Sequence, residues 1–243
     1  MSESKKITVN HEEVAEKLTE MLKPSGWHNL LKGFLYSEDF KNILIALNNL
    51  VDEGQRFTPP LKQVFRAFQE CPLKDLSVVM VGQDPYPQMG VADGVAFSCS
   101  NTGKQEASMR YIFNAIGDTV YKGKVDPKKM NTDLARWSNQ GVLMLNTALT
   151  TEIGKVGKHY DIWKPFINYL FDMLNANDSL VWVFMGKKAE ELADLINSDK
   201  HHHLFCSHPA SAAYQKESKW NCNDVFNKVN VTLETQNKPT ITW

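Results

Sequence analysis

The sequence predicts an α/β fold with a central four-stranded, mostly parallel sheet that is flanked by helices on both faces. Short apolar runs recur at four places after residue 75, and polar or small residues follow each run. Segments with apolar residues at helical spacing lie between the runs. Strands that alternate with helices in this way are typical of a parallel sheet covered on both sides.

The predicted strands and helices alternate from residue 76 onward. We expect strands at residues 76–81, 142–145, 180–185 and 203–206. We expect helices at residues 108–120, 132–140, 162–176, 188–198 and about 221–234. Folds of this class carry their chemistry at the carboxyl ends of the strands. The residues that follow each strand are therefore the first candidates for a site.

A single domain is expected, since α/β domains of about this chain's 243 residues are common. Residues 1–75 form an N-terminal helical part, with amphipathic helices at 40–51 and 61–68 on either side of Thr58-Pro59-Pro60. Residues 76–235 carry the sheet and its helices. Residues 236–243 form a tail that we expect to be loose or an edge extension.

Composition excludes few classes of protein. The apolar content of 42% suffices for a sizeable core, and the net charge of -1 does not indicate a nucleic-acid binder. A one-sided field can still exist, because phosphate binding depends on where the lysines lie. The four cysteines form no C-x-x-C pair, so zinc and iron–sulfur centres are not indicated. The run His201-His202-His203 precedes Leu204 and Phe205, which favours the approach to a strand over a metal site.

The first ten residues, MSESKKITVN, lack the apolar core of a signal peptide. No apolar run approaches the roughly 20 residues that span a bilayer. We therefore expect a soluble intracellular monomer with reduced thiols, in the cytoplasm or nucleus and not in a membrane.

Polar side chains follow three of the predicted strands. Gln83 and Asp84 follow the first strand within GQDPYP (82–87), Asn146 follows the second, and His208 comes just after the fourth. An amide presents a donor and an acceptor together, which suits the edge of a lactam or nucleobase. A carboxylate and a histidine without a metal suggest activation of water. A turn, a cap or a loop would explain each residue alone, but all of them fall on one predicted edge.

Other catalytic classes lack their motifs. The chain has no G-x-x-x-x-G-K-[ST], no G-x-G-x-x-G after a strand and no H-E-x-x-H. It also has no H-x-E with C-x-x-C and no G-x-S-x-G. Nucleotide-cofactor binding, zinc chemistry and a serine nucleophile are therefore disfavoured.

Four segments together resemble the family 1 uracil-DNA glycosylases. They are GQDPYP (82–87), ADGVAFS (92–98), QGVLMLNTALT (140–150) and HPASAA (208–213), and their order and spacing agree with the family. The resemblance covers roughly residues 56–235. It implies a three-layer fold and an enzyme that hydrolyses the N-glycosidic bond of deoxyuridine in flipped nucleotides. Free uracil and an abasic site are the implied products, in single- or double-stranded DNA.

The resemblance also implies roles for the residues of the base pocket. Asp84 would orient the attacking water and favour a cationic sugar, and His208 would bind O2 of uracil as negative charge builds there. The base can then leave as an anion without any metal or cofactor. The implied base-binding residues are Gln83 lining the pocket, Tyr86 excluding the thymine methyl group, Phe97 stacking on the ring and Asn146 holding N3 and O4.

The DNA contacts that the resemblance implies differ more from the family pattern than the base pocket does. The resemblance places phosphate contacts at Pro59, Ser98, Gly186 and Ser211, with a charge from Lys187. The family's HPSPLS loop reads HPASAA here, which puts Ala212 where a leucine fills the vacated base stack. Either Tyr214 replaces that wedge by stacking, or the protein wedges less and prefers single-stranded or unstable sites.

Two functions remain open from the sequence. The first is uracil excision, with uracil-containing DNA as the substrate and a protein inhibitor or replication partner as candidate ligands. The alternative is a non-catalytic or dual-role protein on the same fold that binds DNA or a replication partner. The altered Ala212 loop and the neutral net charge motivate that alternative.

Overall fold

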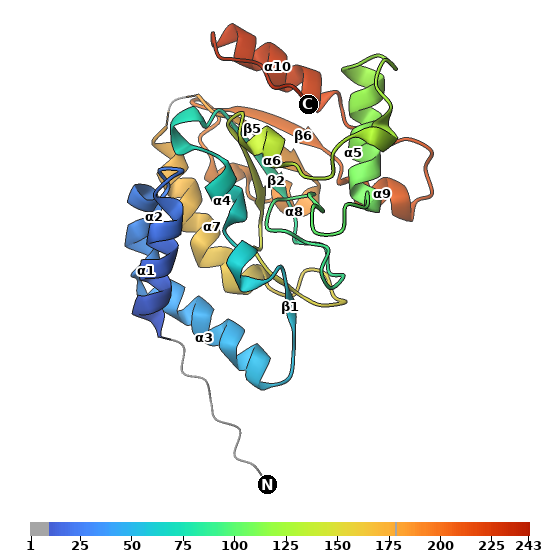
Figure 1. Ribbon diagram of the computed structural model, residues 1–243. Helices are drawn as coiled ribbons and strands as arrows, with labels where there is room; N and C mark the ends of the chain where they lie inside the picture. The colour runs from blue at the N-terminus through green and yellow to red at the C-terminus, as the bar shows by residue number, and fades with distance from the viewer. Residues whose placement is uncertain (1–9, 178) are drawn as a thin grey trace.

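A computed structural model of the protein describes residues 10–177 and 179–243. Its centre is a sheet with the strand order β3-β2-β5-β6, in which all neighbouring strands are parallel. The predicted α/β fold with helices on both faces is confirmed (Figure 1). The four strands are β2 (Val78–Gly82), β3 (Val142–Asn146), β5 (Val181–Met185) and β6 (His202–Cys206).

Each strand sends alternate side chains to opposite faces of the sheet. In β2, Val79 and Val81 join one hydrophobic cluster, whereas Val78 and Met80 join the other. The first cluster is covered by α1 (His11–Leu22), α2 (His28–Leu35), α3 (Glu38–Asp52), α4 (Arg66–Glu70) and α7 (Tyr160–Asn175). The second is covered by α5 (Ala107–Thr119), α6 (Ala135–Ser138), α9 (Pro209–Tyr214) and α10 (Val225–Thr235).

The N-terminal helices form one layer of the fold. Helix α3 begins where the Ser37 side chain accepts a hydrogen bond from the Phe40 N–H, and it buries Phe40, Ile43 and Leu47. This spacing puts the three apolar side chains on one face of the helix. The N-terminal region therefore covers one face of the sheet together with α7 (Figure 1).

Several predicted helices are shorter than expected. The helix predicted at 132–140 is only α6, because the Asp133 side chain accepts the Ala135 N–H and starts the helix late. The helix predicted at 188–198 divides into α8 (Lys187–Glu190) and a 3₁₀ turn at Ala193–Leu195. The segment predicted at 61–68 likewise divides into a 3₁₀ turn at Leu61–Gln63 and α4.

A second, two-stranded antiparallel sheet was not predicted. It pairs β1 (Phe57–Thr58) with β4 (Thr151–Glu152), with Thr58 opposite Thr151. Strands of two residues give no usable alternation in a sequence. This small sheet ties the segment after α3 to the segment after β3.

The prediction that residues 236–243 are loose or an edge extension is wrong for the last residues of the tail. Trp243 is 3% exposed and Ile241 is 4% exposed. The indole of Trp243 packs edge-on against Trp137 and Phe226, with ring centroids 5.4 and 5.1 Å apart. Its carbonyl accepts a hydrogen bond from the Tyr121 hydroxyl at 2.6 Å. The tail therefore closes the second hydrophobic cluster.

Within residues 10–177 and 179–243, the structure holds no helix that is long and apolar enough to cross a membrane.

Replacing Trp243 tests the role of the tail in stability. We expect Trp243→Ala to lower the free energy of unfolding by about 3–5 kcal/mol, as for other buried aromatic truncations. Urea denaturation measures the change. The control is Thr242→Ala, because Thr242 is exposed and only its backbone groups bond to Gln140. If Trp243→Ala lowered the free energy of unfolding no more than Thr242→Ala does, the tail would not be part of the core.

Candidate active site

The four parallel strands bring their carboxyl ends to one edge of the sheet, and polar residues gather there. Gly82 at the end of β2 is paired with Asn146 at the end of β3. Gln83 and Asp84 continue from β2, and His208 follows β6. The predicted convergence of these residues is therefore present in the fold.

A cavity of about 470 Å³ opens at this edge. Its volume is in the range of small-molecule sites. The predicted residues that line the cavity are Gln83, Asp84, Tyr86, Phe97, Ser98, Asn146, His208, Ser211 and Tyr214.

The loop after β2 is fixed to the chain that follows β3. The carbonyl of Gln83 accepts hydrogen bonds from the Thr147 hydroxyl at 2.6 Å and from the Ala148 N–H at 3.2 Å. The carbonyl of Pro87 accepts the Gly154 N–H at 2.8 Å. Both ends of the 83–87 turn are thus anchored, which holds the carboxylate between them in place.

Asp84 is partly buried, and its carboxylate accepts the Gly157 N–H at Oδ2, at 2.6 Å. Burial raises the pKa of Asp84, while Gly157 and the nearby Thr151 and Tyr160 side chains oppose the rise. Since the folded pKa lies above the ordinary value of 3.8, the ionised carboxylate lowers stability at neutral pH. That destabilisation disappears on acidification below the pKa of the unfolded chain.

His208 is neutral at physiological pH. Burial lowers its pKa to about 4. Its Nδ1 accepts the Ala210 N–H at 3.2 Å, which also caps α9. An acceptor nitrogen carries no proton, so the neutral ring bears its proton on Nε2. His208 can therefore donate one hydrogen bond without carrying a charge.

Phe97 lies beside His208 in an unusual backbone conformation. Its φ is 63°, a region that is strained for an aromatic residue and concentrated at functional sites. The two ring centroids are 5.6 Å apart at an interplanar angle of 41°. The Phe97 carbonyl accepts the Tyr86 hydroxyl at 3.1 Å. Burial raises the pKa of Tyr86 well above its usual value, so the phenol is neutral.

Two glycines permit these side chains to approach each other. A Cβ on Gly82 would lie 2.9 Å from Oδ1 of Asn146 and 3.1 Å from the Phe97 ring. A Cβ on Gly186 would lie 2.7 Å from Cβ of His208 and 3.0 Å from Nε2 of Gln83. A side chain at either position would therefore force neighbouring site residues to shift.

Two of the residues predicted to contact DNA are buried. Ser98 is 1% exposed, and its hydroxyl donates to Oδ2 of Asp93 at 2.6 Å while accepting the Leu134 N–H. The Ser98 hydroxyl is thus engaged within the protein, although Ser98 lines the cavity. Ala212 is also 1% exposed and belongs to the second hydrophobic cluster. Tyr214, in contrast, is 82% exposed.

Pro59, Gly186 and Lys187 lie outside the cavity lining. Pro59 and Gly186 are buried, whereas Lys187 is exposed. Gly186 acts on the site by its lack of a side chain, and not by contact with the cavity.

Sequence reasoning missed two segments of the site. Glu106, Ala107 and Ser108 line the cavity where α5 begins. The sequence signal for them was only a helix start. Val156 also lines the cavity, beside the Gly157 that holds Asp84. No motif marks that second segment, because its contact is made by a backbone N–H.

No group of three or more His, Cys, Asp or Glu residues in the described chain could hold a metal ion.

The expected strand position of the histidine run is confirmed, because His202 and His203 begin β6.

Known proteins are similar to this chain along most of its length. A model of the Uracil DNA glycosylase superfamily matches residues 68–233. Uracil-DNA glycosylase of Borrelia duttonii is 34% identical over 220 residues, which cover 89% of this chain and 96% of that protein. The Streptococcus thermophilus enzyme is 32% identical over 222 residues, which cover 90% and 98%.

Solved structures agree with the sequence matches. Mimivirus uracil-DNA glycosylase has a TM-score of 0.79 and 25% identity, with 93% of this chain and 88% of that chain covered. Its Y322L variant, solved in complex with UGI, has a TM-score of 0.79 and 26% identity, with 93% and 90% covered. Because the family match spans most of the chain and the relatives are over 30% identical, this chain belongs to the uracil-DNA glycosylase superfamily.

Proposed function

We propose that this DNA repair glycosylase releases uracil from DNA by flipping the nucleotide into the cavity and hydrolysing its N-glycosidic bond with the named residues. The observation that carries the proposal is the meeting of Asp84, Asn146 and neutral His208 in one cavity. A flipped base in such a pocket is read by hydrogen bonds to its edge and by stacking.

Asp84 orients the attacking water and stabilises the cationic sugar. Its ionised form supplies a negative charge where positive charge develops in the transition state. The Gly157 N–H at 2.6 Å supports this role, because it fixes the carboxylate through a neutral backbone donor. Asp84 thus stays available to the sugar and the water.

His208 and Asn146 bind the leaving base. The Nε2–H of His208 donates to O2 of uracil as negative charge builds on the ring. The Asn146 amide pairs with N3 and O4, and this separates uracil from cytosine, which has an amino donor in place of O4. Gln83 lines the same cavity.

Phe97 and Tyr86 select the shape of the base. Phe97 stacks on the uracil ring, and Tyr86 fills the space that the methyl group of thymine would need. The hydrogen bond from the Tyr86 hydroxyl to the Phe97 backbone carbonyl, at 3.1 Å, supports this arrangement, because it ties the Tyr86 side chain to the backbone that carries the Phe97 ring.

Tyr214 and Ser211 contact the DNA at the cavity rim, and the exposed Lys187 adds a charge for phosphate. Tyr214 replaces the missing wedge by stacking in the gap left by the flipped base, since aromatic side chains stack on any base. The two similar mimivirus structures solved with UGI support UGI as a ligand of this chain too. We propose that the protein acts as a monomer.

Oligonucleotide cleavage tests the proposed function. The protein is incubated with matched strands that carry one uracil or one thymine, single- and double-stranded, without added metal. We expect uracil release from both uracil substrates and none from thymine. Asp84→Asn should lose about 10²- to 10⁴-fold in kcat, as for removal of a general base, while it still binds DNA. No uracil release under any condition would refute the proposal.

The pH profile tests the protonation states. Because burial lowers the pKa of His208 to about 4, kcat/KM should be level between about pH 6 and 8. Activity should fall on acidification as Asp84 takes up a proton, and this should begin at a higher pH than for an ordinary aspartate, because its pKa is raised. An inflection near pH 6.5 in the pH profile of kcat/KM, absent from the profile of His208→Gln, would contradict a neutral His208.

A further inference from the structure

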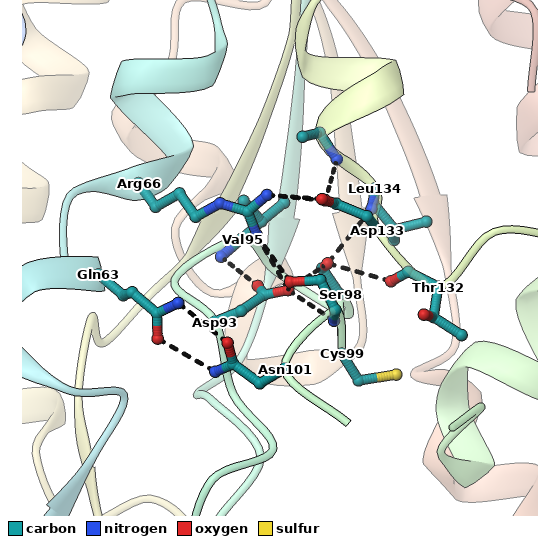
Figure 2. Close-up of polar contacts among 12 residues, drawn as sticks. Gln63, Arg66, Asp93, Val95, Ser98, Cys99, Asn101, Thr132, Asp133 and Leu134 are labelled. Carbon is teal, nitrogen blue, oxygen red and sulfur yellow. Dashed lines mark hydrogen bonds and ion pairs between the residues drawn. The ribbon is translucent and has the colours of Figure 1, made fainter. Parts of the chain in front are cut away.

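A partly buried ion cluster adjoins the loop that lines the cavity, and no function has been assigned above to its residues. Arg66 from α4 contacts Asp93 and Asp133, which come from two other segments of the chain (Figure 2). Nη1 of Arg66 is 3.0 Å from Oδ2 of Asp93, and Nη2 contacts both carboxylate oxygens of Asp133 at 2.8 Å. The cluster thus joins α4, the residue 92–101 loop and the start of α6.

Asp93 organises the 92–101 loop. Its side chain is fully buried. Oδ1 accepts the Val95 N–H at 3.1 Å, and Oδ2 accepts the Ser98 hydroxyl at 2.6 Å. Oδ2 also accepts the Ser100 N–H at 2.9 Å and the Ser100 hydroxyl at 2.6 Å. Among the residues that the structure describes, the donors to this carboxylate other than Arg66 all belong to the loop itself.

The hydrogen bonds of Asp93 enclose Phe97. Val95 precedes Phe97 by two residues and Ser98 follows it directly, so one carboxylate holds the chain on both sides of the residue with φ of 63°. A strained conformation persists only where its surroundings determine it. The carbonyl of Phe97 is in turn the acceptor for the Tyr86 hydroxyl. A displacement of the loop would therefore move both aromatic residues of the cavity.

Stability alone does not account for this cluster. A buried ion pair is often no more stable than apolar residues of the same volume, because both charges must lose their water. A carboxylate that accepts several donors from one loop does, however, determine the geometry of that loop. Arg66 keeps the charge buried, and its planar guanidinium bridges Asp93 and Asp133 in fixed directions.

We propose that Asp93, held by Arg66, is a positioning residue of the glycosylase reaction. It sets Phe97 against the base and, through the Phe97 carbonyl, sets Tyr86 against the C5 edge. This inference rests on the roles proposed above for Phe97 and Tyr86. Asp93 lies outside the cavity lining and acts only through these two residues.

The test compares kcat, KM and base selectivity among variants of the full chain. Asp93→Asn removes the negative charge of the cluster. Ser98→Ala removes only one hydrogen bond to Asp93, next to Phe97, and it serves as the second variant should Asp93→Asn fail to fold. The control is Leu233→Ala in α10, which lowers stability from a fully buried position away from the loop. All rates are measured well below the melting temperature of each variant.

We expect Ser98→Ala to lower kcat for uracil release about tenfold, since small displacements of positioning groups lower rates strongly. We also expect it to raise the ratio of thymine to uracil release, because a displaced Phe97 carbonyl positions the Tyr86 hydroxyl less accurately. Leu233→Ala should change neither quantity more than about twofold, although it lowers the melting temperature at least as much. Equal effects of Ser98→Ala and Leu233→Ala on kcat and on the ratio would overturn the inference.

Phe97→Ala and Tyr86→Ala separate this inference from the proposed function. One outcome would overturn the role of Asp93 alone. In that outcome Phe97→Ala lowers kcat and Tyr86→Ala increases thymine release, but Ser98→Ala and Asp93→Asn change neither quantity. No effect of Phe97→Ala or Tyr86→Ala would refute the proposed roles of the two aromatic residues, and the positioning role of Asp93 with them.

Discussion

The close approach of two strand ends is the constraint on which the active site depends. Gly82 and Asn146 are paired across β2 and β3, and the Phe97 ring lies against the same point. A methyl group on Gly82 would lie 2.9 Å from the Asn146 amide oxygen. The parallel sheet brings the residues to one edge, and the missing side chain lets the amide and the ring share the space there.

Burial then decides the charges at this edge. It lowers the pKa of His208 to about 4 and raises the pKa of Asp84, so both groups are pushed toward their neutral forms. For His208 this gives the neutral donor that its proposed role requires. For Asp84 the hydrogen bond from Gly157 opposes the shift, and it favours the ionised carboxylate that the proposed role of Asp84 requires. Burial thus favours the form that His208 needs and opposes the form that Asp84 needs, and the Gly157 hydrogen bond offsets part of this effect at Asp84.

Sequence patterns predicted the sheet and most of the cavity because both follow local rules. Four apolar runs marked the strands, and the residues just after them lie together at one edge. The sequence patterns did not predict features that depend on packing. Ala212 was placed by its position in the HPASAA loop, but it lies in α9 and is buried in the second hydrophobic cluster. The tail was expected to be loose or an edge extension, yet Trp243 packs on Trp137, which lies more than a hundred residues earlier. The Gly157 contact is made by backbone alone and leaves no side-chain pattern.

The most direct test of the central constraint is the rate of uracil release by Gly82→Ala. The account predicts a loss of about a hundredfold in kcat/KM, because the added methyl group displaces Asn146 and Phe97 from the base. The control is Gly33→Ala in α2, where the new methyl group would meet only the end of the Tyr169 side chain at 3.2 Å. Activity of Gly82→Ala equal to that of this control would contradict the account.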